Sequence, residues 1–186
     1  MTTESEAVVL LNRIAAGNQA ALEGFYRAFE HSIYRYAHLK LNDPHEAADI
    51  LNEVMLEVWN GAERFEGRSR VSTWVLGIAR HKILDRLRAR RPDTTDLDSG
   101  MDIEDTGAPD PVALSAAAEQ AREVRRCLQE LSDRQREVVY LTYYQGLSYP
   151  EIAVVADCPE GTVKTRMYHA RKALQRCLER MQVEPQ

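Results

Sequence analysis

The C-terminal end of the chain carries the pattern that most restricts the fold, a long run of apolar residues at helical spacing. Apolar side chains recur every three or four residues at Val163, Met167, Ala170, Leu174 and Leu178, which places them on one face of a helix. Similar runs fill most of the sequence, glycine and proline number only 9 and 7, and no β-branched alternating segments occur. The sequence therefore predicts an all-α protein.

Helix boundaries are marked by capping residues, glycines and prolines. In the first half they predict helices over 4–16, 18–41, 43–61 and 71–90, with a loop over 62–70. Asp43 stands at an N-cap, Pro44 in the first turn, and Glu46 at the position that completes a capping box. In the second half, the same signals predict helices over about 113–130, 132–146, 148–156 and 159–180.

An acidic segment at 92–120 divides the chain. It holds three prolines and eight acidic residues but no lysine or arginine, and its first part lacks apolar periodicity. Such a segment buries too little surface to offset its ordering entropy, so it is predicted to be a flexible acidic linker, with 112–120 beginning the next helix. Two small helical domains follow from this division, over 1–91 and 121–186.

The net charge of −5 conceals a strong segregation of charge along the chain. Residues 1–63 carry 4 basic and 10 acidic side chains, whereas residues 64–91 carry 9 basic and 2 acidic ones. The acidic segment follows, and residues 121–186 carry 11 basic and 9 acidic side chains. Asymmetry of this size indicates different partners for different segments.

The last two predicted helices, with a turn at Asp157-Cys158 between them, have the spacing of a helix-turn-helix. We expect the apolar face of the final helix to pack on Ile152, Val155, Leu141 and Val138. The first turns of such a helix reach base edges and phosphates. The candidate DNA-binding residues are Glu160, Gly161, Thr162, Lys164, Thr165, Arg166, Tyr168, His169, Arg171 and Lys172. The alternative is a solvated basic face on a purely structural helix.

The segment 64–91 combines a dense basic strip with aromatic residues. A charged strip of this kind suits a phosphate backbone, and aromatic rings beside it hold unstacked bases. The candidates for single-strand binding are the aromatic residues Phe65 and Trp74 and the strip residues Arg80, Lys82 and Arg86. Alternatively, Trp74 is a core residue, Phe65 anchors the loop, and the strip is merely solvated.

An acidic stripe lies on the helix predicted over 43–61. Glu46, Asp49, Glu53 and Glu57 are spaced 3, 4 and 4 residues apart, so they share one face, and no lysine stands four residues away to pair with them. The stripe is either a solvated face or a docking surface for a basic partner.

Other classes of protein find little support. No apolar stretch is long enough to span a membrane, and the polar N-terminus predicts no signal peptide, so the expected compartment is the cytosol. Cys127, Cys158 and Cys177 lack CxxC spacing and are expected to be reduced thiols. Without HExxH spacing or a glycine-rich phosphate loop, we expect no enzyme, no cofactor and no metal site.

Three motifs, in order, resemble bacterial sigma factors of the extracytoplasmic-function (ECF) group, over nearly the whole chain. HEAADILNEVMLEVW at 45–59 is similar to the family's polymerase-binding helix. FEGRSRVSTWVLGIARHKILDRLRARR at 65–91 resembles the segment that melts and captures the −10 promoter element. The stretch 128–174, with GLSYPEIA and CPEGTVKTR, resembles the domain that reads the −35 element.

The resemblance implies a promoter-specificity factor for RNA polymerase. Its partners would be core polymerase, promoter DNA that is duplex at −35 and melted at −10, and an anti-sigma factor. The implied polymerase contacts are Asp49, Asn52, Glu53, Glu57 and Trp59. The resemblance also implies that the displaced strand is held by the loop Phe65–Ser69, which includes Arg68, and by Ser72, Thr73, Arg80, His81 and Lys82. The family often has glutamine where Asn52 stands, and asparagine where His81 stands, so the −10 base preference stays open.

Two rival functions are separable by experiment. A conventional one-component regulator would use the same helix-turn-helix, would usually dimerise, and would need neither the acidic stripe nor the basic aromatic segment. A nucleic-acid-processing enzyme would need a catalytic motif that the sequence lacks.

Overall fold

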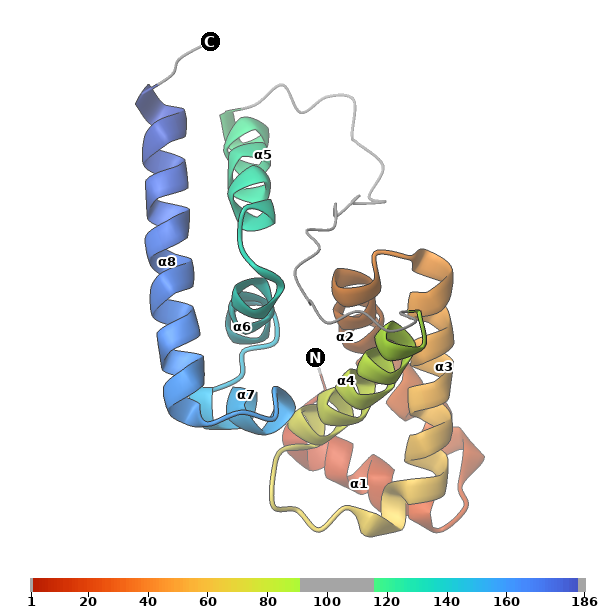
Figure 1. Ribbon diagram of the computed structural model, residues 1–186. Coiled ribbons are helices and arrows are strands. Elements are labelled where there is room, and N and C mark those ends of the chain that lie inside the picture. The colour runs from red at the N-terminus through yellow and green to blue at the C-terminus, as the bar shows by residue number, and fades with distance from the viewer. Residues whose placement is uncertain (1, 91–115, 184–186) are drawn as a thin grey trace. The chain divides into compact units, whose positions relative to one another are not determined.

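The computed structural model describes residues 2–90 and 116–183 (Figure 1). Over these two ranges the chain forms helices and no strand, and it divides into two compact units, one holding the N-terminal helices and the other most of the C-terminal ones. The all-α prediction is confirmed. Residues 92–115 of the predicted acidic linker lie outside the described residues. Its last five residues, 116–120, belong to a helix.

The N-terminal unit contains four α-helices and one short 3₁₀ helix: α1 (Glu4–Ala15), α2 (Gln19–Leu41), α3 (Pro44–Gly61), η1 (Ala62–Arg64) and α4 (Val71–Ala89). The helices begin where short polar side chains accept backbone N–H groups: Thr3 caps α1, Asn18 caps α2 and Asp43 caps α3. The predicted loop 62–70 differs in containing η1, a single tight turn.

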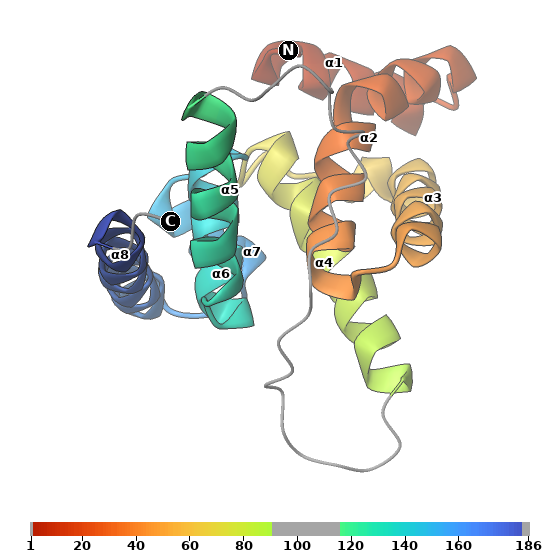
Figure 2. The same cartoon turned by 90° about the horizontal axis from the view of Figure 1, so that it is seen from above.

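The helix α2 forms the centre of this unit and packs against α1, α3 and α4. Its side chains Phe25, Ile33 and Tyr36 are fully buried, as are Ile50 and Val54 of α3. Figure 2 shows α3 and α4 gathered around α2, and α3 and α4 also pack against each other. Side chains of the acidic stripe on α3 pair with side chains of the basic strip on α4 along this seam.

One predicted cap differs from the structure. Asp43 accepts hydrogen bonds from the backbone N–H groups of His45 (2.8 Å) and Glu46 (3.0 Å). The Glu46 carboxylate, however, accepts hydrogen bonds from the Arg90 guanidinium, so the predicted capping box is wrong. A hydrogen bond to a guanidinium is stronger than one to a neutral backbone amide, which explains why the carboxylate turns away.

The C-terminal helices are α5 (Ala116–Gln129), α6 (Asp133–Tyr143), α7 (Tyr149–Val155) and α8 (Glu160–Val183). Ser132 and Gln135 form a capping box at the start of α6. The helix α6 ends three residues before Gly146, which adopts φ +65° and turns the chain toward α7. Both α5 and α6 pack against α8.

The predicted apolar face of α8 is buried over its first half and shifts toward its end. Val163, Met167 and Ala170 are at most 1% exposed. Leu174 and Leu178 are only half-buried, and the fully enclosed residue in that part of the helix is Cys177. Because α5 covers this end of α8, the buried position is the one that faces α5.

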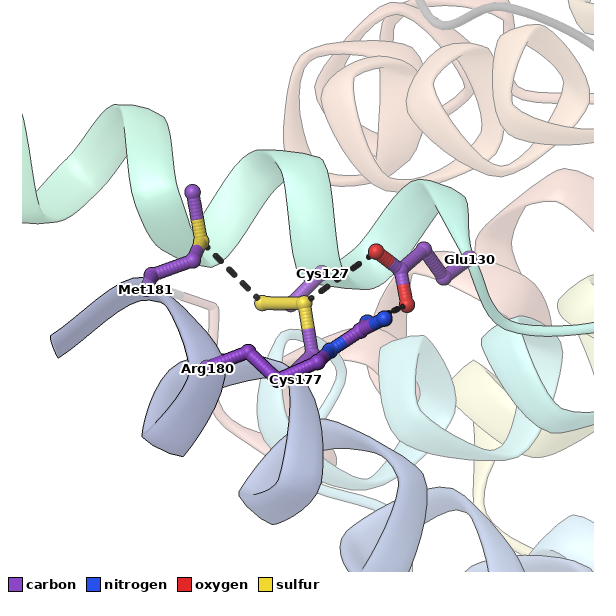
Figure 3. The surroundings of a disulfide bond; sticks show 5 residues. All are labelled: Cys127, Glu130, Cys177, Arg180 and Met181. Carbon is purple, nitrogen blue, oxygen red and sulfur yellow. Dashed lines mark hydrogen bonds and ion pairs between the residues drawn. A yellow bond between two sulfur atoms is a disulfide. The ribbon is translucent and has the colours of Figure 1, made fainter. Parts of the chain in front are cut away.

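A disulfide joins Cys127 of α5 to Cys177 of α8 (Figure 3). Packing of the two helices places the Cα atoms 5.6 Å apart, within the range that a disulfide spans. The expectation of three reduced thiols is therefore wrong for these two cysteines, whereas Cys158 is free. Beside the bond, Arg180 and Glu130 form an ion pair at 2.6 Å that also links the two helices.

A buried arginine ties α5 to α6. The Arg136 side chain is almost fully enclosed, and its guanidinium donates to the backbone carbonyls of Leu128 (3.2 Å), Gln129 (3.0 Å) and Leu131 (3.0 Å). The carbonyls of Leu128 and Gln129 lie in the last turn of α5, where helical carbonyls lose their usual N–H partners, and that of Leu131 follows two residues later. Arg136 therefore caps α5 from the first turn of the following helix.

Among the helices that the structure describes, none is long and apolar enough to cross a membrane.

Candidate nucleic-acid interface

The first surface to consider is the N-terminal half of α8 and the turn before it. Asp157 adopts φ +45°, and the carbonyl of Pro159 accepts hydrogen bonds from the N–H groups of Thr162 (2.9 Å) and Val163 (3.3 Å). Pro159 is thus the N-cap of α8, and the exposed Gly161 follows in its first turn. A helix that begins in this way presents unpaired N–H groups suited to a phosphate.

All ten sequence-predicted residues of this region lie off the buried apolar face of α8. We call them the α8 outer face. Seven of them are exposed: Gly161, Lys164, Thr165, Tyr168, His169, Arg171 and Lys172. The other three, Glu160, Thr162 and Arg166, are half-buried. One side of the helix holds the core, and the other offers cations and hydroxyls to solvent.

Local contacts arrange the cations of the α8 outer face. Lys164 Nζ lies 2.7 Å from Glu160 Oε1, and this carboxylate, as hydrogen-bond partner and as charge, raises the pKa of Lys164. The Lys172 ammonium stands 5.9 Å from the centroid of the Tyr168 ring. Both lysines are exposed, so a DNA phosphate can reach them.

The second surface is the loop 65–70 with the start of α4. The rings of Phe65 and Trp74 lie 5.4 Å apart at 60° to one another, and both are half-buried. Gly67 adopts φ +69°, which other residues rarely adopt, so the turn of this loop depends on glycine. Arg68 is exposed and pairs with Glu66 at 2.7 Å.

The remaining predicted strand-binding residues of α4 and its loop differ in accessibility. His81 is exposed, and Ser69, Arg80, Lys82 and Arg86 are half-buried. Ser72 Oγ is buried and finds no hydrogen-bond partner among the described residues. Thr73 is fully buried, so its side chain contributes to the core in this state.

The predicted polymerase contacts lie along α3. Asp49 and Asn52 are exposed, whereas Glu53, Glu57 and Trp59 are half-buried. A further residue on this helix, Leu56, is 60% exposed, which is unusual for a large apolar side chain between two carboxylates. Its position four residues after Asn52 places Leu56 on the same outward face of α3, a signal that the sequence already carried.

Sequence reasoning also missed that the acidic stripe of α3 is paired with the basic strip of α4. Arg86 Nη2 lies 2.6 Å from Glu53 Oε1, and its Nη1 lies 3.9 Å from Asp49 Oδ2. Lys82 Nζ lies 3.9 Å from Glu57 Oε2. Two sets of residues that were predicted to bind different partners are therefore in contact with each other.

Two domain families of sigma factors match this chain. Residues 25–92 match Sigma-70 region 2, and residues 121–174 match Sigma-70 region 4. The chain is 37% identical over 181 residues to the probable RNA polymerase sigma-C factor of Mycobacterium bovis, covering 92% of this chain and 91% of that protein. It is 30% identical over 177 residues to the ECF RNA polymerase sigma factor SigK of Mycobacterium tuberculosis, covering 94% and 95%.

Solved structures share the fold. CnrH, determined in complex with the cytosolic domain of CnrY, superposes with a TM-score of 0.66 at 22% identity and covers 94% of this chain and 97% of its own. The sigma factor RpoE of Bartonella quintana, determined with the anti-sigma factor NepR, gives a TM-score of 0.62 at 22% identity, with 84% and 96% coverage. The chain belongs to the ECF group of the sigma-70 family, the factors that give RNA polymerase its promoter specificity.

Proposed function

We propose that the two domains of this sigma factor divide promoter recognition between them. Residues 1–91 bind core polymerase through α3 and hold the melted −10 strand with the loop 65–70 and α4. Residues 121–186 bind duplex DNA at the −35 element through the α8 outer face. The proposal is carried by the α8 outer face, where cations and hydroxyls face solvent while the opposite side of the helix is buried.

Strand capture would rely on binding energy rather than on covalent chemistry. Taking a base out of the stack costs a few kcal/mol, which aromatic stacking and phosphate contacts can supply. The half-buried Phe65 and Trp74 rings are placed beside the exposed loop that would receive the base. As a partner of core polymerase, the protein would act in the cytoplasm.

Run-off transcription with core polymerase tests the proposal. A template with −35 and −10 elements should give a transcript only when this protein is added. A conventional regulator would bind duplex DNA alone and would leave core polymerase unable to start at the promoter. Absence of a transcript across a genomic template screen would exclude the sigma function for this chain.

A charge reversal on α3 tests the polymerase-binding surface. Asp49→Lys with Glu53→Lys should abolish capture of core polymerase while the helical circular dichroism spectrum stays unchanged. Because Glu53 lies 2.6 Å from Arg86 and Asp49 lies 3.9 Å from it, Asp49→Lys alone disturbs Arg86 less than the double variant does. Glu23→Lys on the exposed side of α2 is the control for charge. Equal capture of core polymerase by the Asp49 variant and by wild-type protein would contradict the assignment.

We also propose control by an anti-sigma factor. Support comes from the RpoE structure, which was determined with the anti-sigma factor NepR. An inhibitor of this kind would cover surfaces needed for polymerase and for DNA. Co-expression with a candidate partner should suppress run-off transcription and yield a stable complex.

A further inference from the structure

The ion pairs between α3 and α4 form a regular ladder. Its rungs join Lys82 to Glu57, Arg86 to Glu53 with Asp49, and Arg90 to Glu46. Residue numbers rise along one helix as they fall along the other, so the helices run antiparallel at this seam. The cations are spaced four residues apart and share one face of α4. We call this set of residues the α3–α4 ladder.

Partial burial strengthens the ion pairs of the α3–α4 ladder. The side chains of Lys82 and Arg86 are only 25% and 28% exposed, and those of Glu53 and Glu57 are 42% and 43% exposed. Ion pairs at fully exposed sites are strongly screened by water and salt, but screening falls as the pair leaves solvent. These carboxylates therefore lower the positive potential that Lys82 and Arg86 offer to a phosphate.

The carboxylates of the ladder compete with DNA phosphates for Lys82 and Arg86. Lys82 and Arg86 are assigned to the DNA strand, and Glu53 and Glu57 to polymerase, yet in the free chain they neutralise each other. A DNA phosphate that binds Arg86 must share it with two carboxylates, at 2.6 and 3.9 Å. A basic partner that engages the same carboxylates would weaken their hold on the cations.

We propose that the α3–α4 ladder couples polymerase docking to strand capture. Glu53 and Glu57 act as internal counterions that keep Lys82 and Arg86 from binding single-stranded DNA in the free chain. Docking of a basic polymerase surface on α3 draws the carboxylates away and makes the cations available. By thermodynamic linkage, a bound strand in turn strengthens docking by the same factor. This inference rests on the proposed function and specifies how its two binding events are connected.

The experiment measures binding of the free, full-length chain to a fluorescein-labelled (dT)20 oligonucleotide at about 50 mM salt. Glu53→Gln with Glu57→Gln keeps the side-chain shapes and removes two counterions. We expect binding about 3- to 10-fold tighter, with a log–log salt dependence steeper by about 1. Glu23→Gln with Glu179→Gln, both exposed and outside the ladder, makes the same change in net charge and serves as control.

A second pair of substitutions identifies the cations responsible. Adding Lys82→Gln and Arg86→Gln to the Glu53/Glu57 variant should remove the gain, and these two changes should cost that variant more (dT)20 affinity than they cost wild-type protein. An equal gain in the control variant, or a gain that survives loss of the two cations, would overturn the coupling. Thermal unfolding of each variant by circular dichroism confirms that the binding differences belong to folded protein.

Holoenzyme supplies the other half of the test. At saturating core polymerase, Lys82→Gln with Arg86→Gln should reduce promoter opening at least 10-fold, a larger loss than the same variant shows in (dT)20 binding by the free chain. A loss of similar size in free chain and holoenzyme would refute the proposed release of these cations. Failure of wild-type holoenzyme to open any promoter would refute the proposed function instead, and the (dT)20 measurements would still test the internal competition.

Discussion

Reduction of the Cys127–Cys177 disulfide should strongly destabilise the C-terminal unit. The bond closes a loop with a sequence separation of 50 residues that contains α6, α7 and the first part of α8. Releasing that constraint from the unfolded chain costs about 4 kcal/mol of stability in the chain-entropy treatment. For a domain of this size, each kcal/mol shifts the Tm by about 4–8 °C, so the expected fall is about 15 °C or more.

Differential scanning calorimetry of the oxidised chain, with and without a thiol-free phosphine reductant, measures this effect. The transition of the N-terminal unit should stay in place, because both cysteines belong to the other unit. Cys127→Ala with Cys177→Ala should abolish the response to reductant, whereas Cys158→Ala should retain it, because Cys158 is free. A shift below about 2 °C in oxidised wild-type protein would refute the reasoning.

Three further changes test other parts of the structure. Arg136→Met removes the buried cap of α5 and should lower the free energy of unfolding of the C-terminal unit by about 3 kcal/mol in urea titrations, whereas Met at the exposed Arg134 should change it by less than about 0.5 kcal/mol. Lys164→Gln should weaken −35 duplex binding by holoenzyme about 5- to 10-fold in mobility-shift titrations, and unchanged affinity would remove Lys164 from the interface. Hydrogen bonds from the backbone N–H of Glu46, and then of His45, lower the pKa of Asp43 below its ordinary value of 3.8. The stability from this cap is therefore present above about pH 4 and lost as pH falls through the lowered pKa, so the stability difference between wild-type protein and Asp43→Asn should shrink in urea titrations from pH 6 to pH 2.5.

Local features of the chain could be predicted from the sequence because they depend on residues a few positions apart. The caps at Asn18, Asp43 and Ser132 lie next to the helices that they begin. The apolar spacing of α8 likewise fixed which side of the helix is buried near Val163 and Met167. Both kinds of signal are set by helix geometry alone.

Features that join distant segments could not be predicted in the same way. Cys127 and Cys177 carry no spacing signal, and their pairing follows from the packing of α5 on α8. Arg136 carries no local signal that separates it from the surface cations, yet it is buried against carbonyls five to eight residues earlier. The acidic stripe seemed uncompensated because helical spacing finds partners only within one helix, whereas Glu53 meets Arg86, 33 residues away.

The two proposed DNA-binding surfaces should consequently become available under different conditions. On α8, Lys164 is paired within its own helix to Glu160, and the Lys164 side chain is 60% exposed. Such a pair is weak, so a phosphate can replace the carboxylate without help. On α4, Arg86 is enclosed to 28% exposure and held by two carboxylates from another helix. The −35 surface should therefore be competent in the free chain, whereas the −10 cations should become competent once α3 is occupied. In that order, strand capture would be confined to chains already bound to polymerase.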